Sequence, residues 1–214
     1  MVYRTTPKMA ERKRARRDRL LHVAIRVFGR KGYHAATVPM IFAAARASTG
    51  SFYFYFRNKE DIYAAALEAV GERISSALNE AIAAAGPQIL VQMRAAVRAL
   101  VRFLVENPEE ARILIIESSG LGKRLDAVRR KIVDSHTRSV ERALSALGRQ
   151  LPAMETAVTA SCWVGAVYEA VFHWLEQPPD ERVPAERLAQ AIANFNLRGV
   201  GAPAAVVEEG GVKC

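Results

Sequence analysis

Apolar residues recur every three or four positions through most of the chain, which is the spacing of one face of an α-helix. The pattern predicts long helices over residues 11–30, 58–85, 88–106, 123–147, 152–176 and 184–197, with shorter ones within 37–56 and over 109–117. No alternating strand pattern and no repeat period recurs. We therefore predict an all-α fold of about nine helices, with an N-terminal three-helix domain and a larger helical bundle after it.

The stretch 37–56 predicts two short helices joined by a tight turn, a helix-turn-helix. Thr37 can cap the first helix by accepting a hydrogen bond from a free backbone amide, and Pro39 fits its first turn. The pattern breaks at Arg46, and Ser48 can cap the second helix. The first helix has one apolar face that must be covered. That face consists of Val38, Ile41, Phe42 and Ala45.

The second short helix carries candidate contacts to double-stranded DNA. Its N-terminus offers free amides and the positive end of the helix dipole, and small side chains there allow close approach to a groove wall. Phe52 and Phe56 are expected to face the core, while tyrosine hydroxyls can reach phosphate oxygens. The candidate DNA-binding residues are Thr37, Ser48, Thr49, Gly50, Ser51, Tyr53, Phe54, Tyr55 and, at the rim, Lys59.

These residues resemble the DNA-binding signature of TetR/AcrR-type transcriptional regulators. The resemblance covers roughly residues 20–63, and beyond them only the order and length of the helices resemble the family. It implies a transcriptional repressor that pairs through its last two long helices, and the symmetry of such a dimer selects a palindromic operator. The motifs that carry it are Thr37-Val38, Ile41-Phe42-Ala43, Ser48-Thr49-Gly50-Ser51, Phe52-Tyr53-Phe54-Tyr55-Phe56 and Asn58-Lys59-Glu60-Asp61.

Three residues depart from the family pattern. Arg46 stands where a turn glycine is usual, which removes the residue that most readily adopts a left-handed backbone. Pro39 stands where a polar residue is usual, and Phe54 where a polar or histidine side chain is common. Two interpretations of Phe54 stay open: its ring contacts a thymine methyl in the major groove, or it packs inward.

Charge divides the chain into two parts. Residues 1–60 carry 14 Lys and Arg and 3 Asp and Glu, a net charge of +11, whereas the remainder has a net charge of −2. Basic charge next to a helix-turn-helix is the electrostatic footprint of a nucleic-acid binder, although a basic tail can also be merely solvated. The cations crowd the first turns of the 11–30 helix, so we expect DNA binding that depends steeply on salt.

The remaining sequence favours a soluble, cytoplasmic protein without catalytic chemistry. No apolar run is long enough to span a bilayer. The 4 histidines lie at unlike intervals, and the 2 cysteines, Cys162 and Cys214, suggest no metal or redox motif. Cys162 is interpreted as core packing in an apolar helix. We therefore expect no metal, no cofactor, no membrane partner and no enzyme activity.

The predicted domain organisation has four parts: a flexible basic arm over 1–10, the DNA-binding domain over 11–57, an effector-binding and dimerisation domain over 58–198, and a flexible tail over 199–214. The 58–85 helix is predicted to connect the two domains, with Asn58 as its cap. Its length of about 40 Å is sufficient to carry a movement from one domain to the other.

A helical bundle can enclose a small-molecule cavity, so an effector site is expected among the later helices. Each candidate can also be explained as a core or surface residue. The basic run 123–131 is a candidate for an anionic group such as the phosphate of an acyl thioester, or a solvated face. The candidate effector-binding residues are Met93, Phe103, Trp163, Val167 and Tyr168 as lining, Arg112 or Glu117 as a polar anchor, and His173.

The function that these features predict is a ligand-responsive, sequence-specific repressor, which a small and largely apolar effector releases from DNA. Two alternatives remain. The first is an effector-independent repressor that uses the bundle only to dimerise. The second is an architectural protein whose basic arm coats DNA without sequence preference.

Overall fold

A computed structural model describes residues 7–118, 120–148 and 155–208. Within these residues the regular structure is entirely helical, which confirms the all-α fold class. The chain divides into two compact units. Unit 1 contains residues up to Val70 and the segment Glu109–Val128, while unit 2 contains Gly71–Pro108 and the residues from Arg129 onward.

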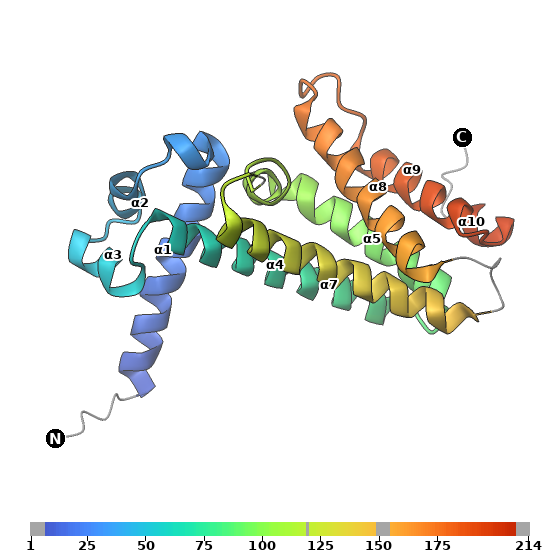
Figure 1. The fold of residues 1–214 in the computed structure, drawn as a ribbon, viewed down its shortest axis with the longest axis horizontal. Helices are drawn as coiled ribbons and strands as arrows, with labels where there is room; N and C mark the ends of the chain where they lie inside the picture. Colours follow the sequence, from blue (N-terminus) through green and yellow to red (C-terminus); the bar gives the residue numbers. More distant parts are fainter. Residues whose placement is uncertain (1–6, 119, 149–154, 209–214) are drawn as a thin grey trace. The chain divides into compact units, whose positions relative to one another are not determined.

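Unit 1 is built around a long first helix. The units do not follow the linear order of the predicted domains, because residues 58–70 and 109–128 pack with the N-terminal helices. Figure 1 shows α2 and α3 beside α1, whose first turns extend past α3. The elements are α1 (Pro7–Ala35), α2 (Val38–Ala44), α3 (Thr49–Tyr55), the first turns of α4 (Lys59–Ala84), most of α6 (Pro108–Ala111), the π-helical turn η1 (Arg112–Ile116) and the start of α7 (Lys123–Leu147).

Helix α1 is longer than the predicted helix over 11–30. It begins at Pro7, so the part of the predicted flexible arm that is described is helical, while residues 1–6 lie outside the described residues. Residues 8–19 are all exposed. Gly32 interrupts the helix at φ 76° and ψ 162°, a conformation that glycine adopts readily.

The core of unit 1 joins α1 to segments that are distant in sequence. Phe28 and Tyr63 are fully buried and meet edge to face, with ring centroids 4.8 Å apart. The Tyr63 hydroxyl donates a hydrogen bond to the carbonyl of Ile113 at 3.1 Å. Burial, together with the negative charge of Glu117, raises the pKa of this hydroxyl, so it stays neutral. The segment 109–118 is therefore part of the core that holds the helix-turn-helix.

Unit 2 is a helical bundle in which α5 packs against α9 and α8. The side-chain amide of Asn196 donates to the carbonyl of Trp163 at 3.2 Å and joins α9 to α8. An ion pair between Arg98 and Glu186 joins α5 to α9. Besides the later turns of α4 and α7, the helices are α5 (Ile89–Glu106), α8 (Thr156–Glu176), α9 (Ala185–Gly199) and α10 (Ala204–Glu208).

Two expectations for unit 2 were wrong. The predicted flexible tail over 199–214 contains the helix α10, and Val207 in it is buried; residues 209–214 lie outside the described residues. Cys162 is exposed, because it lies on the face of α8 that no other described element covers. Cys214, and the first residues of the helix predicted to begin at 152, also lie outside the described residues.

None of the helices in the described part of the chain combines the length and apolar character needed to cross a membrane.

Gly29 permits the close approach of α1 to α6 within unit 1. A Cβ at this position would lie 2.5 Å from the Cβ of Glu109 and 2.6 Å from its Cα. Because backbone must then move, Gly29→Ala should lower the free energy of unfolding by about 1–3 kcal/mol. Urea denaturation at fixed protein concentration measures this. Gly199→Ala, which places its Cβ in open space, should change it by less than about 0.5 kcal/mol.

Candidate functional site

The two predicted caps of the helix-turn-helix are confirmed. The Thr37 hydroxyl accepts from the backbone amide of Met40 at 3.4 Å, and the Ser48 hydroxyl accepts from that of Ser51 at 3.2 Å. The apolar face of α2 packs as expected: Ile41 and Ala45 are buried, and the other two members of that face are half-buried. Local capping and one buried face therefore fix the position of α3.

Helix α3 separates anchor residues from a free outer face. Phe52 and Phe56 are buried, whereas Tyr53 is 55% and Phe54 64% exposed. Phe54 therefore does not pack inward. A Cβ on Gly50 would meet no atom within 4 Å, so the N-terminal turn of α3 is open to close approach. This face has the small N-terminal residues and exposed rings that were expected of a helix presented to a groove.

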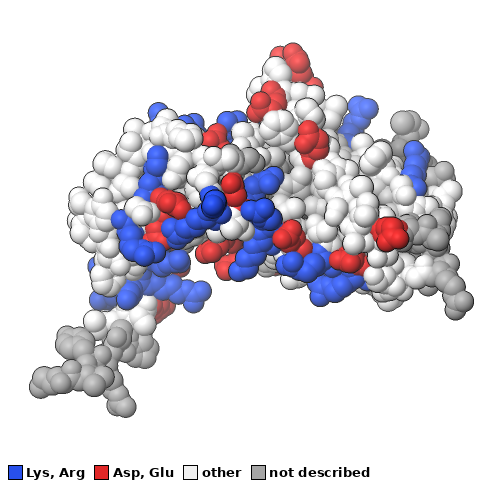
Figure 2. All heavy atoms as spheres, viewed as in Figure 1, with Lys and Arg blue, Asp and Glu red and all other residues white. Residues whose placement is uncertain are grey.

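Exposed cations of α1 lie beside this face of α3. The ammonium of Lys13 is 4.7 Å from the centroid of the Phe54 ring, and the guanidinium of Arg17 is 5.5 Å from that of Phe56. Figure 2 shows Lys and Arg side chains gathered over this end of α1. An ion pair in the same turns joins Arg14 to Asp18 at 3.9 Å, and both of its side chains are exposed, so it contributes little stability.

Arg46 keeps the turn that a glycine usually forms. Its φ is 52°, and it is the only residue other than glycine with a positive φ among those described. A left-handed conformation costs an L-residue with a Cβ roughly 1–2 kcal/mol. The turn between α2 and α3 thus retains its geometry at the expense of local strain.

Lys59 has a structural role that sequence reasoning missed. Its ammonium donates to the carbonyls of Tyr33 at 2.8 Å, His34 at 3.3 Å and Ala36 at 3.1 Å. It also lies 4.4 Å from the centroid of the Tyr33 ring. A cation at the C-terminal end of a helix satisfies carbonyls that have no helical partner. Because its three protons are used inside unit 1, Lys59 is poorly placed to donate to a phosphate as well.

An ion pair holds the start of α7 against the start of α4 within unit 1. The guanidinium of Arg124 donates to Asp61 at 2.7 Å, and this hydrogen bond keeps the pKa of the Asp61 carboxyl below its usual value. The side-chain oxygen of Asn58 accepts from the amide of Asp61 at 2.8 Å, which confirms the predicted cap. Arg124, a candidate for an anionic ligand, is therefore already paired.

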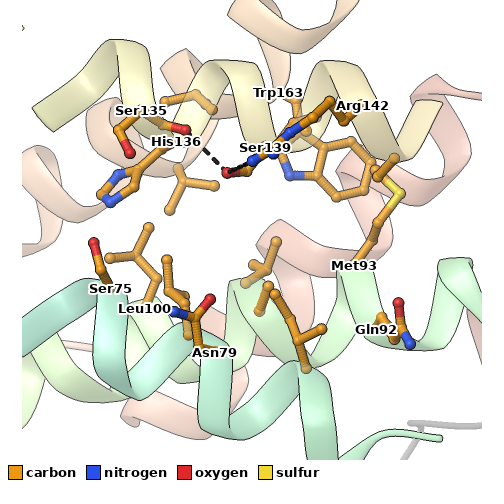
Figure 3. Close-up of a pocket in the computed structure, with 18 of the residues that line it drawn as sticks. Ser75, Asn79, Gln92, Met93, Leu100, Ser135, His136, Ser139, Arg142 and Trp163 are labelled. Atoms are coloured by element: carbon orange, nitrogen blue, oxygen red, sulfur yellow. Dashed lines mark hydrogen bonds between the residues drawn. The ribbon is translucent and has the colours of Figure 1, made fainter. Parts of the chain in front are cut away.

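Unit 2 contains a cavity of about 470 Å³, drawn in Figure 3. Most of its lining is apolar, and His136 and Ser75 lie at one end, with Trp163 and Met93 toward the other. Such a volume is within the range of small-molecule sites. The lining residues are Ser75, Leu78, Asn79 and Ile82 of α4, Ile89, Gln92, Met93, Ala96, Val97 and Leu100 of α5, Ser135, His136, Ser139, Val140, Arg142 and Ala143 of α7, and Trp163, Val164 and Val167 of α8.

The cavity includes part of the predicted effector set, namely Met93, Trp163 and Val167. Phe103 lies outside the lining, with the guanidinium of Arg73 5.3 Å from its ring centroid. His173 is exposed and pairs with Glu169 at 3.1 Å. Phe103 and His173 have the helical spacing of lining residues, but spacing alone does not indicate which side of a helix faces the cavity.

The two predicted polar anchors belong to unit 1 and do not line the cavity. Glu117 accepts from the backbone amide of Tyr33 at 3.2 Å and lies 3.7 Å from Arg112. Its carboxylate also fills the space beside Gly32, where a Cβ would meet it at 3.0 Å. The carboxylate thus binds a backbone amide at the break in α1, a role that the sequence pattern does not reveal.

His136 is the buried polar residue of the cavity, and sequence reasoning did not select it. It is 7% exposed, and its Nδ1 lies 3.0 Å from the hydroxyl of Tyr168. Its Nε2 is buried and has no hydrogen-bond partner. Burial lowers the pKa of His136 from 6.5 to about 4 and raises that of the Tyr168 hydroxyl, so both groups are neutral at pH 7. Tyr168, a predicted lining residue, instead supports His136 from behind.

Among the described residues, no three His, Cys, Asp or Glu side chains form a group that could hold a metal ion.

Comparison with known protein families identifies the family of the segment that contains the helix-turn-helix. The family model described as bacterial regulatory proteins, tetR family, matches residues 20–66, the segment that contains α2 and α3. The segment 20–66 of the chain is therefore of the TetR family. The match begins at the first buried residue of α1 and ends in the turns of α4 that pack in unit 1.

Similar proteins include a curated repressor and two solved structures of similar fold. The HTH-type transcriptional repressor NicS of Pseudomonas putida is 30% identical over 122 residues. The match covers 55% of this chain and 55% of NicS, about half the length of each. The structure of FadR from Bacillus subtilis in complex with stearoyl-CoA has a TM-score of 0.75 at 19% identity, covering 86% of this chain and 98% of that one. AibR in complex with isovaleryl coenzyme A and operator DNA has a TM-score of 0.70 at 20% identity, covering 84% and 97%.

The strain at Arg46 can be measured. Arg46→Gly should raise the free energy of unfolding by about 0.5–1 kcal/mol, because relief of the left-handed strain exceeds the entropy that glycine adds to the unfolded chain. Arg46→Ala is the matched control, since it removes the same charge but keeps the strain. Urea unfolding of the DNA-free protein compares them, and an equal effect of both substitutions would contradict the assignment of strain.

The lowered pKa of His136 predicts acid sensitivity. The unfolded chain binds a proton at this residue below pH 6.5, whereas the folded protein does so only below about pH 4. Stability should therefore be complete above pH 6.5 and fall as the pH drops toward 4, by roughly 3 kcal/mol from this group. Urea unfolding measured across this pH range should show that the double variant His136→Phe/Tyr168→Phe loses less stability than the unmodified protein. Tyr168→Phe alone should lose stability with falling pH as the unmodified protein does. The prediction would be contradicted if the double variant lost just as much.

Proposed function

We propose that this protein is a ligand-responsive, sequence-specific DNA-binding repressor that acts as a homodimer on a palindromic operator. The observation that carries the proposal is the free outer face of α3, capped by Ser48 and flanked by exposed cations of α1. A short helix with small residues at its N-terminus suits insertion into the major groove. The repressor NicS, 30% identical over 122 residues, supports repression as the regulatory outcome.

The proposed DNA contacts are of two kinds: contacts to phosphates, which position the protein, and contacts to bases, which read the sequence. The hydroxyls of Tyr53 and Tyr55 and the amides at the start of α3 bind phosphates, and fix the register of the helix in the groove. Phe54, exposed at the centre of this face, offers an apolar contact to a thymine methyl. The ammonium of Lys13 over the Phe54 ring brings a cation to the same place.

The exposed turns of α1 supply attraction that does not depend on sequence. Each phosphate that a cation neutralises adds about 0.9 to the slope of log affinity against log salt concentration. Release of counterions therefore accounts for much of the affinity at low salt. The cations on residues 8–19 are Lys8, Arg12, Lys13, Arg14, Arg16, Arg17 and Arg19.

Exposed apolar side chains on the last long helices support dimerisation. Val158 on α8 is 62% exposed and Phe195 on α9 is 68% exposed. Cys162 and Gly165 extend the same face of α8, and a Cβ on Gly165 would meet nothing within 4 Å. A face of this kind on two long helices pairs with its own copy about a twofold axis. The twofold then selects a palindromic operator.

The effector binds in the cavity of unit 2 and acts through helices that serve both units. Helix α4 contributes Ser75 to the cavity lining and Asp61 to an ion pair in unit 1; α7 contributes His136 to the same lining and Arg124 to the same ion pair. A ligand that favours one arrangement of these helices changes the spacing of the two α3 helices of a dimer. The expected coupling is about 1–3 kcal/mol. FadR and AibR, similar in fold, bind acyl-CoA molecules.

The proposal is tested by a mobility-shift assay with the DNA upstream of the protein's own gene. At about 150 mM salt we expect binding to this duplex at least about a thousandfold tighter than to a random duplex of equal length. Equal affinity for both would reject sequence-specific repression and favour the architectural alternative. Operator binding that no apolar or acyl-thioester compound weakens would favour the effector-independent repressor.

Tyrosine variants in the same assay test the assignment of contacts. Tyr53→Phe and Tyr55→Phe remove only a hydroxyl and should weaken operator and random DNA by a similar factor, because phosphate contacts carry no sequence information. Phe54→Ala is the comparison: it should weaken the operator more than random DNA. A tyrosine effect confined to one base-pair position would show that the hydroxyl reads a base instead.

A further inference from the structure

The cavity of unit 2 contains one polar group whose chemistry can be specified further. His136 lines the cavity, its Nδ1 is occupied by Tyr168, and its Nε2 is buried without a partner. A buried polar group without a partner costs free energy, and native structures rarely tolerate one without a reason. Figure 3 shows the ring of His136 at one end of the cavity, with Ser75 of α4 facing it.

The hydrogen bond between His136 and Tyr168 sets which ring nitrogen carries the proton. Tyr168 is 7% exposed, and in the described structure its hydroxyl forms only this bond. If Nδ1 were protonated and donated to the phenol oxygen, the phenol hydrogen would be buried without an acceptor. If the phenol donates to an unprotonated Nδ1, the phenol hydrogen and Nδ1 are both satisfied, and the ring proton lies on Nε2. The second arrangement leaves one group without a partner, Nε2–H, whereas the first leaves two, the phenol hydrogen and the Nε2 lone pair.

We propose that the cavity takes a neutral, largely apolar molecule carrying a carbonyl-type hydrogen-bond acceptor, which the Nε2–H of His136 binds. This inference rests on the proposed effector function of the cavity. Tyr168 is a positioning residue: it touches no ligand and fixes the tautomer of the histidine that does. The hydroxyl of Ser75, on the opposite side of the same end, offers a second donor to the same acceptor.

The rest of the lining argues for a neutral molecule. Arg142 is the one charged residue of the lining; it is exposed, and its guanidinium already bonds to the hydroxyl of Ser139 at 3.2 Å and the carbonyl of Arg138 at 3.3 Å. A carboxylate beside His136 would therefore be buried without a free cation, which is costly. The apolar lining of α4, α5 and α8 instead favours a hydrocarbon or aromatic body.

The tautomer can be observed directly in the full-length protein. Long-range ¹H–¹⁵N correlation of the histidine side chains at pH 7 separates the protonated from the unprotonated ring nitrogen. The signals of His136 are identified as those that disappear in His136→Phe/Tyr168→Phe, a pair that removes both partners together and so leaves no unmatched group. We expect Nδ1 to be unprotonated and Nε2 protonated. The opposite assignment overturns the proposal.

Binding of three bicyclic probes of similar shape tests the preferred ligand class. Indanone carries only an acceptor, indole only a donor, and indene neither. Calorimetric titration should show indanone binding roughly five- to tenfold more tightly than either of the others, the difference expected of one net hydrogen bond. If indole binds as tightly as indanone or more tightly, the proposal that His136 donates a hydrogen bond to the ligand is wrong. The cavity would still be a ligand site.

Variants separate the role of Tyr168 from simple packing. In Tyr168→Phe the tautomer is no longer fixed, so the preference for indanone over indole should fall toward one; a role limited to packing would weaken both probes equally and keep the ratio. In His136→Phe/Tyr168→Phe the preference for indanone over indene should fall because, of the two proposed donors to the acceptor, only the hydroxyl of Ser75 remains. Failure of all three probes to bind would instead reject the cavity as the effector site, while the NMR measurement would still decide the tautomer.

Discussion

Helix α3, the proposed DNA-reading helix, depends on the closure of unit 1 by a segment that lies far along the chain. Gly29 lets the backbone of Glu109 approach α1, and the Glu109 carboxylate accepts from Arg30 at 2.9 Å, which keeps its pKa below the usual value. Glu117 then binds the amide beside the break at Gly32. α2 and α3 are short, and short helices gain little stability alone. Their position therefore rests on α1, and that of α1 rests on α6 and η1.

Much of the fold follows from local sequence signals. Hydroxyl caps at Thr37 and Ser48, the glycine break at Gly32 and the limits of α5 and α7 are set by residues next to them, so periodicity and capping rules suffice. By contrast, no local signal predicts that unit 1 combines two separate segments of the chain. This combination depends on the fit between Gly29 and Glu109, residues 80 positions apart, and one sequence carries no signal for such a pairing.

The candidate site divides in the same way. The outer face of α3 was predictable, because helical spacing separates Phe52 from Tyr53 and the motif is local. The roles of Lys59 and Glu117 were not, since both bind backbone groups of α1, and backbone carbonyls and amides leave no mark in a sequence. His136 was missed for a related reason. A single histidine in an amphipathic helix has no pattern, and only its burial against Tyr168 distinguishes it from the exposed His173.

The proposed regulation sets a limit on how strongly the exposed turns of α1 can hold DNA. Their contacts to phosphate carry no sequence information, so they can hold any duplex after an effector has weakened operator binding. A coupling of about 1–3 kcal/mol corresponds to about a 5- to 150-fold change in affinity. Neutralising six phosphates changes affinity by about a thousandfold between 50 and 200 mM salt. Effective release therefore requires that contacts of α3, such as the exposed ring of Phe54, supply more of the operator affinity than the cations do. In this proposal the exposed turns of α1 attract DNA of any sequence, and release from the operator depends on the contacts of α3.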